Sequence, residues 1–139
     1  MGVQIKQGGD GALGLEGKDA GVGSFVCGVI NYNVPVAGVA QCILNPGRSL
    51  VIDSIIGRPR VVGSGGAATF TIYKAASGTA PASGTALHSG TYNMVGTADT
   101  DQTLTLTTTT LAAGEAIYAV PTGTATSAIG SIAVNCRPL

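Results

Sequence analysis

The arrangement of apolar and polar residues between Ala67 and Leu111 is typical of short β-strands joined by loops of small residues. Within it, Phe70 and Ile72 alternate with polar or amphipathic neighbours over Thr69–Lys74, the period of two that sends successive side chains to opposite faces of a sheet. Every threonine of the chain lies at or after Thr69, and threonine suits strands better than helices. This region therefore predicts a rigid β-structure.

Comparable signals recur at short intervals from Ser24 onward. The segments that we expect to form strands are Ser24–Tyr32, Val34–Leu44, Ser49–Ile56, Thr69–Lys74, Thr91–Val95, Thr103–Leu111, Ala116–Pro121 and Ile129–Cys136. In the third of them, strict alternation places Leu50, Ile52 and Ile56 on one face and Ile55 on the other.

Glycine and proline mark the expected breaks between these strands. Asn45-Pro46-Gly47 predicts a turn, and both Arg58-Pro59-Arg60 and Gly63–Gly66 are expected to end the strand before them, while Ala75–Gly90 reads as a long connection. No segment shows a sustained apolar repeat of 3.6 residues. We therefore expect an all-β fold, a jelly-roll-like antiparallel β-sandwich of about seven to nine strands.

The first part of the chain has a different composition. Residues 1–23 are rich in glycine, with Leu13, Leu15 and Val22 as scattered apolar positions. Glycine is costly to order, so we expect an extended N-terminal arm over 1–23 that becomes ordered only against a neighbour. The β-sandwich domain is expected to occupy residues 24–139.

The composition excludes several classes of function. The chain has 139 residues, of which 45% are hydrophobic and 10% charged, and its formal net charge is zero. One domain of this size buries a substantial core. Without a basic patch there is no electrostatic basis for binding nucleic acid or an anionic membrane. Few charges also mean little resistance to association, which favours a protein that functions in an assembly.

Three cysteines, Cys27, Cys42 and Cys136, are an odd number with no metal-ligand spacing. Their apolar neighbours predict buried, reduced thiols, which suits synthesis in the cytoplasm. The N-terminus has no continuous apolar stretch, so we expect no secretory signal. Ala20–Gly47 carries no charge, but its asparagines, glycines and Pro35 favour two strands joined at Asn33-Val34-Pro35 over a membrane-spanning helix.

Motifs associated with catalysis or cofactors have simpler explanations here. Gly9–Gly14 fits GxGxxG but is followed by no helical pattern and no suitably placed acidic residue, so we interpret it as a chance match in the arm. His88 is the only histidine and is expected to be a solvated loop residue. Asp99 and Asp101 are expected to form a polar turn before the next strand, although two carboxylates could also contribute to a calcium site.

Ser64, Ser77 and Ser83 lie in small-residue loops, none of them within a GxSxG elbow. Aromatic residues make up 4% of the chain and there is no tryptophan, which disfavours stacking platforms for sugars or bases. We therefore expect no enzyme activity, no catalytic residue, no cofactor and no metal site.

The pattern of strands and loops in residues 48–139 resembles that of small capsid decoration, or cement, proteins of tailed bacteriophages. The resemblance is carried by ATFTIYKAASGTAPASGTALHSGTYN, by TADTDQTLTLTTTTLAAGEAIYAV and by the closing GSIAVNCRPL, with a glycine-rich arm before a neutral β-domain. It implies a jelly-roll on the outside of a capsid that clamps neighbouring major capsid subunits, as a homodimer or homotrimer. It also implies a virion location after synthesis in the bacterial cytoplasm, with neither nucleic acid nor membrane as a partner.

Two other classes of function stay open. β-Domains of head fibres, tail fibres and baseplates have a similar texture, so host attachment is the alternative function. An adhesion module would need exposed aromatic residues or a polar pocket, and an enzyme would need a cluster of titratable groups.

Overall fold

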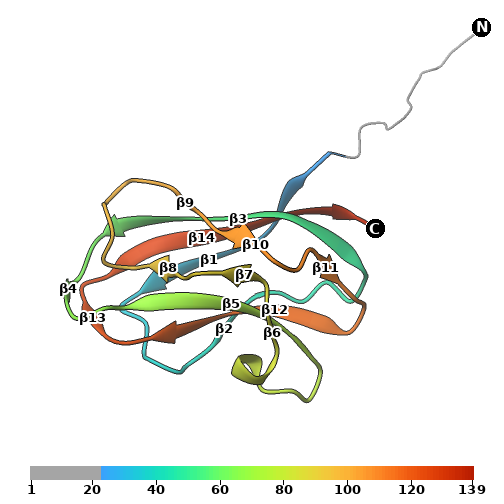
Figure 1. Ribbon diagram of the computed structural model, residues 1–139, viewed down its shortest axis with the longest axis horizontal. Coiled ribbons are helices and arrows are strands. Elements are labelled where there is room, and N and C mark those ends of the chain that lie inside the picture. The colour runs from blue at the N-terminus through green and yellow to red at the C-terminus, as the bar shows by residue number, and fades with distance from the viewer. Residues whose placement is uncertain (1–22) are drawn as a thin grey trace, which may run out of the picture.

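The computed structural model describes residues 23–139, so all of the expected arm except Gly23 lies outside the described residues. The described chain folds into two antiparallel five-stranded sheets that pack face to face (Figure 1). Sheet A contains, in spatial order, β1 (Phe25–Asn33), β14 (Ile129–Pro138), β3 (Leu50–Val61) and β11 (Thr110–Leu111), with β9 (Gln102–Thr103) also on β3. Sheet B contains β2 (Gln41–Leu44), β12 (Glu115–Thr122), β5 (Thr69–Ala76) and β6 (Thr85–Ala86), with β8 (Tyr92–Asn93) also on β5.

Smaller elements connect the strands of the two sheets. Two short antiparallel pairs and one 3-10 turn complete the fold: β4 (Ser64–Gly65) with β13 (Ala125–Thr126), β7 (His88–Ser89) with β10 (Thr105–Leu106), and Pro81–Ser83. Within residues 23–139 no helix has the length and apolar character needed to cross a membrane. The uncharged stretch Ala20–Gly47, which was long enough for a membrane span, contains strands β1 and β2 instead.

The order of the strands is that of a jelly roll. The chain passes from β1 in sheet A to β2 in sheet B, then to β3 in sheet A and β5 in sheet B, and it returns through β12 and β14. β14 consequently pairs with both β1 and β3, and β12 pairs with both β2 and β5, all antiparallel. The predicted all-β sandwich with jelly-roll-like connectivity is confirmed.

Strand β3 differs from its prediction in length and in register. It continues through Pro59 to Val61 because Pro59 keeps its pairing with Gly130. Ile55 is fully buried and Ile56 is only half-buried, the reverse of the expected alternation. The register with β14 shifts where Cys136 pairs with Ile52 and the next pair is formed by Ser54. One extra residue in β3 moves every later side chain to the other face.

The expected strand Thr103–Leu111 is broken into β9, β10 and β11. Its two ends pair with β3, but its middle turns away, where Thr107 N–H donates to the Leu87 carbonyl and β10 pairs with β7. Val34–Leu44 is likewise shorter than expected, because only Gln41–Leu44 is strand. Val34 begins the connection with a φ of 45°, unusual for a β-branched residue, and its N–H donates to Ala128.

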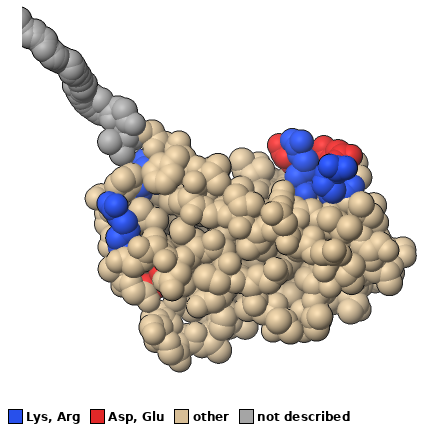
Figure 2. All heavy atoms as spheres, turned by 180° about the vertical axis from the view of Figure 1, so that it is seen from behind, with Lys and Arg blue, Asp and Glu red and all other residues tan. Residues whose placement is uncertain are grey.

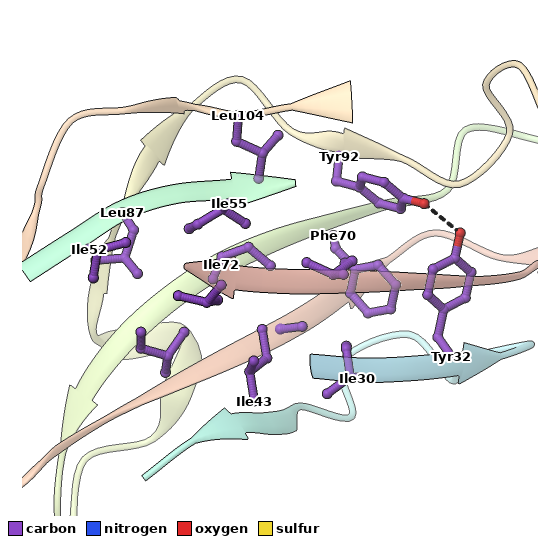
Figure 3. Close-up of a cluster of buried hydrophobic side chains, with 14 of the residues drawn as sticks. Ile30, Tyr32, Ile43, Ile52, Ile55, Phe70, Ile72, Leu87, Tyr92 and Leu104 are labelled. Carbon is purple, nitrogen blue, oxygen red and sulfur yellow. Dashed lines mark hydrogen bonds between the residues drawn. The ribbon is translucent and has the colours of Figure 1, made fainter. Parts of the chain in front are cut away.

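The core between the sheets includes a cluster of three aromatic rings, Tyr32, Phe70 and Tyr92, that surrounding aliphatic side chains enclose (Figure 3). The Tyr32 and Tyr92 hydroxyls are 2.7 Å apart and hydrogen-bond to each other, which satisfies both polar groups in the interior. Burial raises the pKa of both phenols above the usual range. Gly57 and Gly130 lie against these rings, and a Cβ at either position would overlap a tyrosine.

Candidate contact surface

The outer face of sheet A carries an apolar row bordered by small polar residues. Val29, Ala133 and Ile56 are neighbours across β1, β14 and β3 and form the row. On one side of it Asn135 donates from Nδ2 to Ser54 Oγ at 2.8 Å, and on the other side lie Asn31 and Ser131. None of these side chains carries a charge, and the charged residue next to them is Arg58, the β3 neighbour of Ser131. We call this surface, defined by Val29, Asn31, Ser54, Ile56, Ser131, Ala133 and Asn135, the sheet A outer face.

A shallow open depression of about 350 Å³ lies in this face. Short side chains on β14 form its floor, and the Arg58–Asp101 ion pair stands at its margin. Its lining residues are Val26, Ile56, Gly57, Arg58, Asp101, Ser131, Ala133 and Asn135. The surface is thus hollowed, mainly neutral, and able to receive an apolar side chain beside amide and hydroxyl groups.

The charged side chains of the described chain mostly neutralise one another. In the view of Figure 2 they gather toward the two ends and leave a wide uncharged area between them. The four acidic residues of the described chain each form an ion pair with a basic residue, in the pairs Arg58–Asp101, Arg60–Asp99, Lys74–Glu115 and Arg137–Asp53. Such a surface has no extended field of one sign with which to steer a charged partner.

Exposed apolar side chains add to the neutral character in two places. Phe25, Val26 and Val29 on β1 are each about half exposed, at 51%, 57% and 49%. A second group lies where sheet A ends at the Ile129–Val61 pair and where the β1–β2 connection begins. Its members are Val34, Val36, Val39, Val61, Val62 and Ile129. Exposed apolar side chains that gather in one region are typical of interaction sites.

His88 is not the solvated loop residue expected from the sequence. It is 5% exposed, its Nε2 accepts the Ile72 N–H at 2.9 Å, and its Nδ1 lies 3.2 Å from the Ser89 carbonyl. A neutral ring with its proton on Nδ1 satisfies both contacts. Burial lowers the pKa of His88, while hydrogen bonds from its ring to the backbone of Ser89 and Gly90 act in the opposite direction. The side chain replaces a backbone partner that sheet B lacks at this point.

The other titratable candidates do not converge on a site. Asp99 has a positive φ of 56° in the turn before β9, where its carboxylate and that of Asp101 are engaged by two different arginines. Ser64 bonds to Thr126 at the β4–β13 pair, and Ser77 and Ser83 lie in turns after β5. Residues 23–139 contain no group of three or more His, Cys, Asp or Glu side chains placed to hold a metal ion. The Gly9–Gly14 motif lies outside the described residues.

The prediction of three buried thiols is wrong. Cys27 on β1 and Cys136 on β14 form a disulfide, with Cα atoms 6.0 Å apart and 109 residues of separation, and Cys42 on β2 is exposed. Cys27 lies at the register shift between Val26 and Gly28, where it has no Cα partner on β14, and the residue paired with Cys136 is Phe25. Sequence spacing could not show this, because the pairing depends on the first and last strands being neighbours.

Comparison with known proteins gives little further information. No family model matches the chain, and no curated protein matches it. Among solved structures, a chain of the infectious bursal disease virus Gx strain is similar over 82% of this chain, at 19% identity and a TM-score of 0.33. A chain of the Gt strain is similar over 89%, also at 19% identity and a TM-score of 0.33. The protein spans 31% and 35% of those chains, and likeness at this level carries no argument about function.

Proposed function

We propose that this chain is a structural virion protein that decorates the outside of a bacteriophage capsid and cements neighbouring major capsid subunits against internal pressure. The observation that carries the proposal is the sheet A outer face, where Val29, Ala133 and Ile56 form an apolar row beside a shallow depression. The charged residues that line this depression, Arg58 and Asp101, neutralise each other. A water-exposed sheet face of a free monomer normally carries many charged side chains. A neutral, hollowed face suits lasting contact with another protein surface.

The proposed mechanism needs no chemical step. A protein that binds the assembled lattice better than its separate subunits stabilises the lattice by that difference in affinity. A symmetric shell offers many equivalent sites, so individually weak contacts add up when one molecule or one oligomer touches several subunits. Aliphatic contacts at the sheet A outer face would supply this affinity through burial.

The proposal extends to partners and location. The partners are the major capsid protein of the same particle and further copies of this chain, and the location is the outer capsid surface after synthesis in the host cytoplasm. The protein acts without catalysis or cofactor. Arg58, the arginine that lines the depression, is paired with Asp101, which supports a protein partner over nucleic acid.

The test uses phage particles produced from a genome in which the gene for this chain has been deleted. Purified full-length protein is added back, and bound protein and the temperature of DNA release are measured. We expect added protein to bind and to raise the release temperature. Ala133→Lys, which places a charge in the apolar row, should abolish both effects, whereas the matched control Thr71→Lys on the opposite sheet should retain them. Particles that do not bind the unmodified protein would contradict the proposal.

A further inference from the structure

β1 differs from the other strands that end the two sheets. It has nine residues, whereas β2, at the corresponding edge of sheet B, has four, and β6, β8, β9 and β11 have two each. β14 pairs with one side of the β1 backbone, and no strand in residues 23–139 pairs with the other side. β2 meets the inner face of β1, where a Cβ at Gly28 would collide with the Ile43 carbonyl. The edge itself is therefore unpaired within the described chain.

Long unpaired edges are usually protected by charged residues, by proline or by bulges, since their N–H and C=O groups otherwise pair with another chain. From Gly28 to Asn33, β1 has none of these features. Its single register shift lies before Gly28, and the six residues after it pair with β14 without interruption. Val29, Asn31 and Asn33 point outward and are exposed, so a new neighbour would not have to displace core side chains.

We propose that the Gly28–Asn33 edge pairs antiparallel with the same segment of a second copy, forming a homodimer. A two-fold arrangement brings one surface against itself, which is favourable only when that surface does not repel its own image. This edge meets the condition because no residue from Ala20 to Gly47 is charged. Antiparallel pairing also places the N-terminal ends of the two β1 strands at opposite ends of the joint edge. The residues that precede β1 in one copy therefore do not collide with those of the other copy.

The geometry of such a pair has a consequence for the surface described above. Two identical antiparallel strands in one sheet are related by an axis perpendicular to that sheet, so both sheet A outer faces lie on the same side. The dimer therefore presents one continuous neutral surface of twice the width. The pairing does not depend on the proposed function, and it is tested without any particle.

The experiment measures association of the full-length protein by sedimentation over a range of concentrations. Asn31→Lys and Asn31→Glu place like charges opposite each other at the middle of the joint edge, and each alone should raise the dimer dissociation constant about tenfold or more. Mixing the two variants should restore dimers. Thr105→Lys adds the same charge on β10, where its side chain is exposed, and should dimerise as the unmodified protein does.

Hydrogen exchange supplies a second measurement that does not depend on a substitution. Amide protection within Gly28–Asn33 should increase with protein concentration in step with dimer formation. The proposal would be overturned by a protein that stays monomeric at high micromolar concentration, or by Asn31 variants that dimerise as the unmodified protein does. It would also be overturned if the Asn31 variants still formed dimers and deletion of residues 1–22 abolished them. The last result would identify the N-terminal segment as the contact instead.

Discussion

The two sides of the sandwich differ in the length and regularity of the strands at their sheet edges. On one side, residues 85–111 run along both sheets as the two-residue strands β6 to β11, and their side chains Leu87, Met94 and Leu104 are buried in the core. On the other side, β1 ends sheet A as a long strand with half-exposed Phe25, Val26 and Val29. We call them the closed side and the open side. On the closed side β8 pairs with β5 of sheet B, and β7 pairs with β10.

The difference indicates how this fold divides stability from contact. The closed side leaves no long edge, because its chain turns repeatedly and bonds to loops and side chains, including His88. The open side keeps a regular backbone and neutral side chains at the surface. We infer that the closed side serves folding and that the open side serves association.

Reduction of the Cys27–Cys136 disulfide should have the largest effect. The bond joins β1 to β14 across 109 residues, and closing a loop of about 100 residues stabilises a fold by about 4–5 kcal/mol in the chain-entropy description. Urea unfolding with and without reductant measures the difference. Reductant should lower the free energy of unfolding of the Cys42→Ala variant by the same amount. It should leave that of the Cys27→Ala/Cys136→Ala double variant unchanged. Equal stability of the oxidised and reduced protein would contradict the prediction.

The tyrosine pair should show strong coupling. Tyr32→Phe leaves the Tyr92 hydroxyl buried without a partner, which costs about 1–3 kcal/mol. The double variant Tyr32→Phe/Tyr92→Phe removes both hydroxyls and should be close to the unmodified protein in stability. Denaturant unfolding of all four proteins gives the coupling. Additive losses would show that the two hydroxyls act independently.

His88 should make stability depend on pH. Its pKa is lowered in the folded protein, whereas in the unfolded chain it is about 6.5. The unfolded state therefore binds more protons between these values, so stability is full above about pH 6.5, falls as the pH is lowered to the folded-state pKa and then levels off. Melting temperatures from pH 4 to 8, compared with His88→Gln, isolate this contribution. A histidine-dependent loss of stability at rising pH would contradict it.

His88→Ala at neutral pH should cost about 1–3 kcal/mol, because the Ile72 N–H loses its acceptor. This loss would not be expected of the solvated loop residue that the sequence predicted. Chemical denaturation measures the loss. An unchanged midpoint would mean that another group satisfies the Ile72 N–H.

The smallest effect on stability should follow deletion of residues 1–23. The strands of residues 25–138 pair among themselves, so the melting temperature of the isolated protein should change little. Attachment to particles should weaken, because apolar positions such as Leu13 and Leu15 would no longer be available to a partner. Undiminished attachment of the truncated protein would mean that the arm makes no contact.

Much of the fold could be predicted from the sequence, because alternation and turn residues are local signals. Phe70 and Ile72 face the core as the pattern of β5 required. The exceptions depend on distant partners. Ile55 is buried in place of Ile56 because β14 fixes a bulge in β3, and His88 is buried because Ile72 lacks a backbone acceptor.

The candidate surface was harder to predict. The lack of charge around β1 was visible in the sequence, and the asparagines, glycines and Pro35 of the same stretch correctly favoured strands over a membrane helix. The depression was not visible, because its lining comes from β1, β3, β14 and the turn at Asp101, which only the jelly-roll order brings together.

Hydrogen exchange of the protein, free and bound to its particle, tests the division between the two sides most directly. The account predicts that binding slows exchange in β1, β14 and the adjoining part of β3, and leaves residues 85–111 unchanged. Protection confined to residues 85–111, with β1 and β14 exchanging as in the free protein, would contradict it.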